Sequence, residues 1–225
     1  MNLNEHTIWI CWYQGIQNLN THAKNSACYN SWINYSEHNN IVLLHDDNIK
    51  EYAPEYYDII TSSPYRRIQA KSDLLRLILL EKYGGTWIDA SVYCNKKFEE
   101  IYLNTMNDSN FFAYRYIPRS INIKGNKEVA SWYISNNTIN SYIIKAWKTK
   151  FLKRYMHDKN WKLFTIHETL CELYDTDINI KNTLNDMIQL NQTAPHSASK
   201  GKKCEHSYVY KRPNIYHINA WNNIK

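Results

Sequence analysis

Two charged residues, Asp73 and Arg76, lie three positions apart in a stretch of the sequence that is otherwise strongly apolar. On a helical wheel, the leucines and the isoleucine of residues 74–80 cover nearly the whole circumference, so this helix is predicted to be buried. Asp73 and Arg76 are neighbours on one side of it. Buried charges must be paired or must face a polar cavity. The spacing leaves two interpretations open: an ion pair that locks the helix, or two side chains that point into a ligand site.

A further carboxylate, Asp89, follows this helix after a glycine turn. Gly84 and Gly85 end the helix, and residues 86–88 form a short apolar strand that stops at Asp89. Ligands of open α/β sheets bind at the carboxyl ends of strands. A carboxylate placed there suits Mg²⁺ or Mn²⁺, which bind through one or two carboxylates and substrate phosphates. The tripeptide Asp-Ala-Ser is a weak signal alone, but after the Ser-Asp-x-x-Arg helix it predicts a site for a metal and a diphosphate.

The elements that must position these residues alternate between strand and helix. Apolar, β-branched and aromatic runs predict strands, and longer periodic segments predict helices. The predicted strands are residues 8–12, 41–45, 86–93, 110–116 and 207–218, and the predicted helices are residues 25–35, 66–83, 139–155 and 165–174. This order predicts an α/β fold whose mainly parallel central sheet is flanked by helices.

Composition limits the class of protein without choosing a function. The 225 residues are 44% hydrophobic, which is typical of one folded domain with a real core. The formal charge of +6 is compatible with a phosphorylated ligand, an anionic membrane surface or nucleic acid, and equally with simple solubility. Nineteen tyrosines and eight tryptophans fill a core, and such a surplus also suits stacking on sugar or base rings.

The cysteines and apolar segments predict a cytoplasmic protein. The five cysteines are scattered and form no CxxC pair, so they are expected to be reduced thiols. No signal-peptide pattern is visible at the N-terminus, and the longest apolar run, residues 74–80, is far shorter than the roughly 20 residues of a membrane span. Any contact with a membrane would therefore be peripheral.

Residues 70–94 resemble the signature of GT-A glycosyltransferases, a group that includes capsular polysaccharide synthesis proteins, Och1-type mannosyltransferases and, more remotely, clostridial glucosylating toxins. The likeness is strongest to the capsular group, whose opening strand is similar to residues 8–15 and the following Ser31-Trp32. Weaker similarity occurs at residues 131–134, 164–167 and 216–217. The resemblance implies one Rossmann-like GT-A domain over residues 1–225, with a nucleotide-sugar half (1–95) and a mainly acceptor-binding half (96–225).

The resemblance also implies roles for individual residues. Trp12 would stack on the nucleotide base, although it could simply pack in the core. Asp73 and Arg76 would bind donor hydroxyls and phosphate, and with Asp89 they form the expected catalytic set. The expected nucleotide-sugar site comprises Trp12, Gln14, Ser72, Asp73, Arg76, Trp87, Asp89, Ala90 and Ser91.

The predicted metal site is the least complete part of this assignment. Asp89 and Ser91 occupy the two ends of the family's DxD motif, and Ser91 stands where a second acid is usual. The metal, Mn²⁺ or Mg²⁺, therefore has fewer charged ligands. A late histidine, His217, is a candidate third ligand, with a surface role as the alternative. His167 and Glu168 could face the acceptor or serve capping and core roles.

The expected activity is transfer of a sugar from a nucleotide-diphosphate donor to a hydroxyl of a saccharide acceptor. By resemblance, the donor is a UDP-sugar, the reaction retains anomeric configuration, and the acceptor is a lipid-linked oligosaccharide in capsule or O-antigen assembly. One alternative is a sugar-nucleotide-binding protein that has lost catalysis, with Ser91 marking the loss. A basic nucleic-acid-binding domain is the other, but no RNP-like, helix-turn-helix or zinc-finger pattern supports a nucleic-acid partner.

Overall fold

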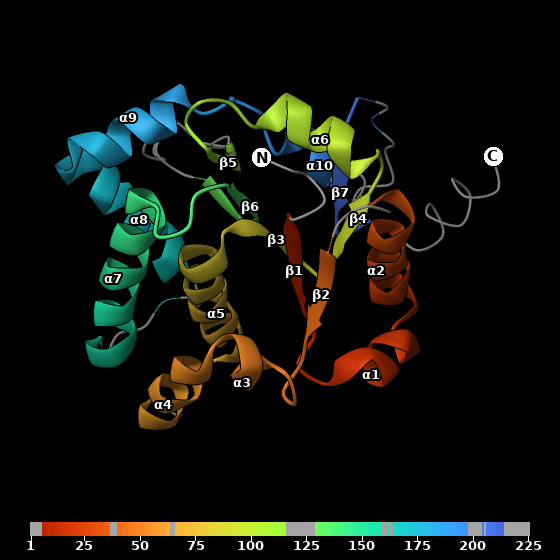
Figure 1. Ribbon diagram of the computed structural model, residues 1–225, viewed down its shortest axis with the longest axis horizontal. Coiled ribbons are helices and arrows are strands. Elements are labelled where there is room, and N and C mark those ends of the chain that lie inside the picture. Colours follow the sequence, from red (N-terminus) through yellow and green to blue (C-terminus); the bar gives the residue numbers. More distant parts are fainter. Residues whose placement is uncertain are drawn as a thin grey trace.

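The computed structural model describes residues 6–36, 40–63, 66–115, 129–158, 162, 164–197, 204 and 206–213. Its centre is a five-stranded sheet in the order β2-β1-β3-β6-β5 (Figure 1). The strands are β1 (Thr7–Cys11), β2 (Asn40–Leu44), β3 (Gly85–Asp89), β5 (Phe111–Arg115) and β6 (Val129–Asn136). Strand β1 pairs in parallel with β2 and β3, whereas β6 pairs antiparallel with β3 and β5. Only β6 therefore runs against the others, and the predicted mainly parallel sheet is confirmed.

Helices cover one face of the sheet. They are α3 (Ile49–Tyr52), α4 (Pro54–Ser62), α5 (Ile68–Tyr83), α7 (Tyr142–His157), α8 (Thr165–Thr176) and α9 (Ile178–Asp186). Their buried side chains share one core cluster with Trp9 of β1 and Trp87 of β3. Figure 1 shows α5 against the sheet, with α7 and α8 outside it.

The opposite face carries a smaller layer. It contains α2 (Ala23–Tyr35), α6 (Phe98–Thr105) and a two-stranded antiparallel sheet of β4 (Val92–Cys94) and β7 (Val209–Lys211). These elements pack around Trp32, Phe98 and Ile88 in a second core cluster. Two short helices, α1 (Gly15–Thr21) and α10 (Thr193–Ser197), complete the described elements. The small sheet matters for function because it brings β7, late in the chain, beside the segment that follows β3.

Helix α5 is buried almost all round, as its sequence predicts. Every residue from Asp73 to Leu80 is buried, including the two charged ones. The helix ends at Gly84 with φ +67°, and Gly85 follows at φ +92°. A Cβ on Gly85 would lie 2.3 Å from the carbonyl oxygen of Thr7. Only glycine allows these backbone angles together with so close an approach of β3 to β1.

Several parts of the structure differ from the sequence prediction. The single strand expected at residues 86–93 is wrong, because a turn at Ala90 and Ser91 separates β3 from β4. No helix was predicted directly after β1, but Gly15 begins helix α1 there. Strand β6 was not predicted, because seven of its eight residues are buried, and the five buried residues after Ser131 give no alternation between a buried and an exposed face. Within the expected strand 207–218, β7 occupies Val209–Lys211, and residues 214–225 lie outside the described residues.

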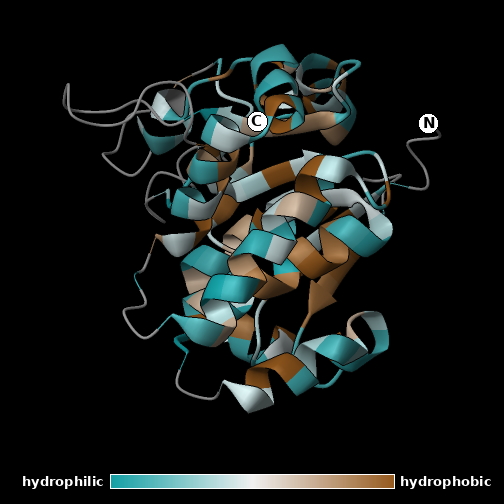
Figure 2. Ribbon diagram, turned by 90° about the vertical axis from the view of Figure 1, so that its left-hand side faces the viewer, coloured by the Kyte–Doolittle hydropathy of each residue, from teal (hydrophilic) through white to brown (hydrophobic). Residues whose placement is uncertain are grey.

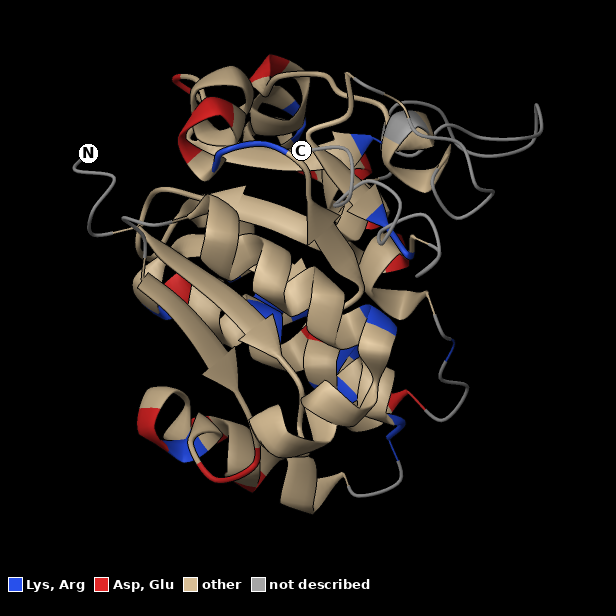
Figure 3. Ribbon diagram, turned by 90° about the vertical axis from the view of Figure 1, so that its right-hand side faces the viewer, with Lys and Arg blue, Asp and Glu red and all other residues tan. Residues whose placement is uncertain are grey.

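Hydropathy and charge follow the layers. Hydrophobic residues gather in the middle of the molecule and hydrophilic residues on the outer helices (Figure 2). Lys, Arg, Asp and Glu lie mostly on helices and connecting segments, and the long strands carry few of them (Figure 3). Among the described residues, no helix has the length and apolar character needed to cross a membrane. All five cysteines are free thiols, as predicted.

Candidate active site

A cavity of about 820 Å³ opens at the carboxyl ends of β1 and β3. Cys11 and Asp89, the last residues of these two strands, are register partners and both line it. The cavity brings together all nine residues of the predicted nucleotide-sugar site: Trp12, Gln14, Ser72, Asp73, Arg76, Trp87, Asp89, Ala90 and Ser91. Ser131 of β6, Phe164 and His167 near the start of α8, and Arg212 after β7 also line it.

The three predicted catalytic residues form one connected charge cluster. Nη2 of Arg76 lies 3.0 Å from Oδ1 of Asp73 and 3.4 Å from Oδ1 of Asp89. Asp73 and Arg76 are only 6% and 4% exposed. Both interpretations of their spacing therefore hold at once: they make a buried ion pair, and they face a cavity.

Arg76 is held in place by contacts other than its carboxylates. Its guanidinium donates to the backbone carbonyl of Ser131, and Nε lies 3.4 Å from the carbonyl oxygen of Ser72. The guanidinium carbon lies 5.1 Å from the centre of the Trp87 ring. A cation fixed in this way can meet a developing negative charge without reorganising.

Asp89 remains ionised because cations surround it. Burial acts to raise its pKa, but the charges of Lys211 and Arg76 outweigh burial and hold the pKa well below its usual value. Nε1 of Trp87 also donates to Oδ1 of Asp89 at 3.1 Å. The carboxylate is thus a permanent negative charge that orients both cations.

Lys211 of β7 was missed by the sequence analysis. Its Nζ donates to Oδ2 of Asp89 at 2.7 Å and to Oγ of Ser91 at 2.9 Å. The antiparallel pairing of Lys211 with Val92 brings it there. Its side chain is only 5% exposed. Burial lowers the pKa of its amine, and the charge of Asp89 counters that effect. No local motif marks this lysine, because its partner lies 122 residues away.

The donor set at this position does not fit a divalent metal. The oxygens of Asp89 and Ser91 that would bind Mn²⁺ or Mg²⁺ already accept hydrogen bonds from an ammonium group. Within the described ranges, no three His, Cys, Asp or Glu side chains are grouped closely enough to hold a metal ion. The third predicted ligand, His217, lies outside the described residues.

Two titratable groups that line the cavity, Asp73 and His167, have shifted pKa values. Burial raises the pKa of Asp73 to about 7, although Arg76 opposes this shift. Burial, together with the charge of Arg76, lowers the pKa of His167 to about 4. His167 is therefore neutral near pH 7, and its buried Nδ1 has no hydrogen-bond partner among the described residues. Asp73 exchanges its proton near neutral pH.

Trp12, predicted to stack on the base, and Gln14, another residue of the predicted nucleotide-sugar site, both line the cavity. Trp12 directly follows β1 and is half-buried, whereas Trp9 is 2% exposed in the core. Nε1 of Trp12 donates to Oδ1 of Asn18 at 2.9 Å, and its ring makes an edge contact with His22 at 5.1 Å. Gln14 is exposed at the start of α1. The indole is thus oriented by α1 while it borders the cavity.

The model of the capsular polysaccharide synthesis protein family matches residues 1–212. The chain belongs to this family. The family match ends at Arg212, so it spans Lys211 and every predicted site residue except His217. A separate comparison with curated proteins returned no match.

One solved structure supports the fold. The PaToxG glycosyltransferase matches with a TM-score of 0.51 and 14% identity, over 80% of this chain and 71% of that one. A transferase double mutant matches with a TM-score of 0.44 and 10% identity, over 92% of this chain and 94% of that one. The first of these shows that this capsular-family chain has the fold of a glycosyltransferase.

Proposed function

We propose that the protein is a glycosyltransferase that transfers a sugar from a nucleotide-diphosphate donor to a hydroxyl of a saccharide acceptor in capsule or O-antigen synthesis. The observation that carries this proposal is the charge cluster of buried Asp73 and Arg76 with the partly exposed Asp89 in one cavity with Trp12. Membership of the capsular family and the glycosyltransferase fold agree with it. The cluster supplies charge for a diphosphate, and Trp12 supplies an aromatic surface for a base.

Each residue has a role in this scheme. Arg76 stabilises the charge that develops on the departing diphosphate, because its guanidinium is already fixed before the reaction. Asp73, buried beside it, bonds to hydroxyls of the donor sugar. The anomeric carbon becomes oxocarbenium-like in the transition state, as in glycoside hydrolysis. The UDP base and retention of configuration are proposals from the family resemblance.

The acceptor would enter near the start of α8. Phe164 is 60% exposed there and lies 5.7 Å from the ring of His167. Exposed aromatic rings suit the apolar faces of sugars. His167, which is neutral and lines the cavity, is able to exchange a hydrogen bond with the acceptor hydroxyl. A lipid-linked acceptor, and with it peripheral contact with a membrane, belongs to the same proposal.

A donor screen followed by a turnover assay tests the function. Thermal shifts are measured with UDP-, GDP- and CMP-sugars, with and without Mn²⁺. A ligand at a hundredfold excess over its dissociation constant stabilises a protein by about 2.7 kcal/mol. The donor that binds is then incubated alone, and release of free nucleotide is followed.

The outcomes separate the candidate functions. Slow nucleotide release supports an enzyme. Binding without release, in the presence of saccharide acceptors as well, would favour the inactive nucleotide-sugar-binding protein, which the ammonium group in the Asp89–Ser91 motif keeps open. Failure of every nucleotide sugar to bind would contradict both.

A further inference from the structure

Two consecutive cations of the C-terminal region meet the Asp89–Ser91 motif from the side of β4. Lys211 bridges the two ends of the motif, with Nζ at 2.7 Å from Asp89 and 2.9 Å from Ser91. Its ammonium also lies 5.7 Å from the centre of the Trp132 ring. It thus occupies the position that a divalent cation would need in order to use these two residues as ligands.

The next residue, Arg212, is more accessible to a ligand than Lys211. It is exposed, it lines the cavity, and its guanidinium makes no hydrogen bond or ion pair in the described part of the chain. Its backbone has φ +51°, an uncommon conformation for a residue with a side chain. Its backbone N–H donates to the carbonyl oxygen of Ser91 at 2.8 Å. This conformation, which costs free energy, holds an unpaired guanidinium beside the motif.

The side chains of the site already supply the excess positive charge that a metal ion would otherwise bring. Three cations, Arg76, Lys211 and Arg212, stand against two carboxylates, Asp73 and Asp89. The site is therefore positive before any ion binds. A guanidinium suits the diphosphate of a nucleotide sugar because it binds phosphate oxygens in bidentate geometry.

We propose that Lys211 and Arg212 together replace the divalent cation of the motif. Lys211 is a positioning residue that neutralises Asp89 and fixes Ser91, and Arg212 binds the donor diphosphate directly, opposite Arg76. The inference rests on the proposed function, and it replaces the predicted requirement for Mn²⁺ or Mg²⁺ with a requirement for these two side chains.

Calorimetric titration tests the inference, with UDP, GDP and inorganic pyrophosphate as probes in buffer containing either EDTA or Mn²⁺. For the wild-type protein, the best-binding probe should have dissociation constants that agree within about twofold in the two buffers. Donor turnover should likewise survive EDTA. If the probes bind only with Mn²⁺, the inference is wrong while the proposed function stands. If no probe binds in either buffer, the proposed function itself fails.

Variants assign the two roles. Arg212→Ala should raise the dissociation constant by about tenfold or more in EDTA, because charge-assisted hydrogen bonds are lost. Arg212 is exposed, so this variant should fold normally. Lys211→Met should also weaken binding of the probe. Lys211→Arg, which keeps the positive charge, should restore part of the affinity, whereas a lysine needed only for packing would show no such dependence on charge.

The control is Lys148→Met, which removes a lysine that pairs with Glu81 away from the cavity. It should bind the probe as the wild type does. Unchanged binding by Arg212→Ala and Lys211→Met in EDTA would overturn the inference.

Discussion

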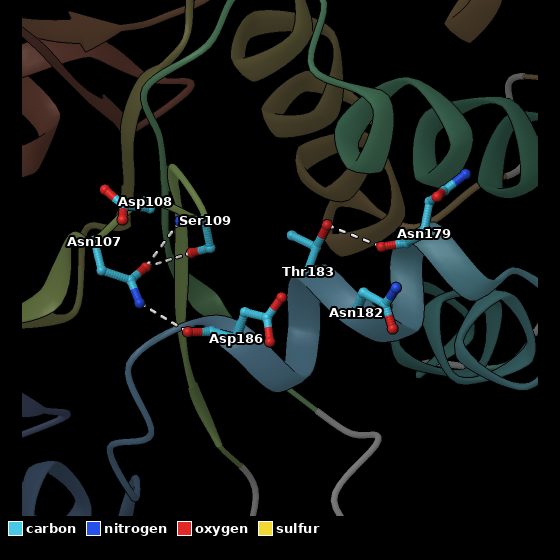
Figure 4. A pocket seen from close by; sticks show the side chains of 7 residues that line it. All are labelled: Asn107, Asp108, Ser109, Asn179, Asn182, Thr183 and Asp186. Carbon is cyan, nitrogen blue, oxygen red and sulfur yellow. Dashed lines mark hydrogen bonds between the residues drawn. The ribbon is translucent and has the colours of Figure 1, made fainter.

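Two polar cavities of this protein show how different a reactive site is from a polar surface. The cavity at Asp89 has a volume of about 820 Å³, and a second, of about 580 Å³, lies between α9 and the segment before β5 (Figure 4). The second is lined by Asn107, Asp108, Ser109, Asn179, Asn182, Thr183 and Asp186. It thus contains two carboxylates, as the first does, but neither a cation nor an aromatic ring lines it.

The difference lies in what the side chains bind. In the second cavity they bond locally: Asn107 donates to the backbone oxygen of Asp186 at 2.7 Å, and Thr183 donates to that of Asn179 at 2.9 Å. Both carboxylate residues there, Asp108 and Asp186, are exposed. At the first cavity a carboxylate and a guanidinium are buried on one helix, where unpaired charge costs much free energy. Substitutions should therefore affect function in the first cavity and little in the second.

The largest expected effect is that of Asp89→Asn. The amide cannot hold the charges of Arg76 and Lys211, so their cations lose the group that orients them. We expect sugar transfer, measured as nucleotide release with acceptor, to fall by about a thousandfold. The matched control is Asp186→Asn in the second cavity, which should retain wild-type turnover. An Asp89→Asn protein with full activity and normal melting temperature would remove Asp89 from the mechanism.

Arg76→Met should reduce both turnover and stability. It leaves the buried carboxyl group of Asp73 without its partner. Because Arg76 no longer opposes the raised pKa, the group is protonated near pH 7, and we expect the lost hydrogen bond to cost about 1–3 kcal/mol. Turnover should fall by about a hundredfold. Urea unfolding and initial rates measure the two effects.

The double variant Asp73→Asn/Arg76→Met separates structure from chemistry. It should regain much of the lost stability, because neither ionisable group of the pair remains in the buried part of α5, but it should not regain turnover. Recovery of turnover along with stability would mean that the pair serves only to lock α5.

The sequence predicts best those parts of the site that depend on local pattern. Helix α5 is recognised because its apolar residues cover the whole wheel, and Asp73 and Arg76 then need explanation wherever the helix lies. Gly84 and Gly85 mark its end, and Asp89 follows from the short strand behind them. Neighbouring residues determine all of these features, so one sequence suffices.

The parts that were missed depend on contacts between distant segments. Lys211 reaches Asp89 only through the pairing of β4 with β7, and Ser131 reaches Arg76 only because β6 adds to the sheet beside β3. No local pattern marks Lys211, and Ser131 stands only in the segment of weak family similarity at residues 131–134. Single-sequence patterns do not encode such long-range pairing.

Trp12→Ala tests whether the tryptophan that lines the first cavity binds the base of the donor. Stacking of a base on an aromatic side chain contributes about 1–3 kcal/mol, so donor affinity should fall by about tenfold or more. The loss should appear in KM for the donor and leave kcat little changed, because Trp12 is expected to bind the base and not the reacting atoms. The donor KM of Trp12→Phe, which keeps an aromatic ring, should lie between those of Trp12→Ala and the wild type. Equal donor KM for Trp12→Ala and wild type would assign this tryptophan to packing alone.

The smallest expected effect is a pH dependence of donor binding in the first cavity. Asp73 has a pKa of about 7, whereas His167 has a pKa of about 4 and that of Asp89 lies well below its usual value. Between pH 6 and 8, Asp73 is therefore the group among these three that titrates. As pH rises through 7 it loses its proton, the positive charge of the cavity falls by one, and an anionic donor binds more weakly.

Affinity for a nucleotide sugar, measured by calorimetry, should fall by about threefold across this window. A nucleotide sugar is the right probe because it lacks the terminal phosphate monoester, which itself titrates near pH 6. Asp73→Asn removes the titrating group and should give a flat profile. If the decline persisted in Asp73→Asn, the titrating group would lie elsewhere, and Asp73 would be ionised throughout as a fixed partner of Arg76.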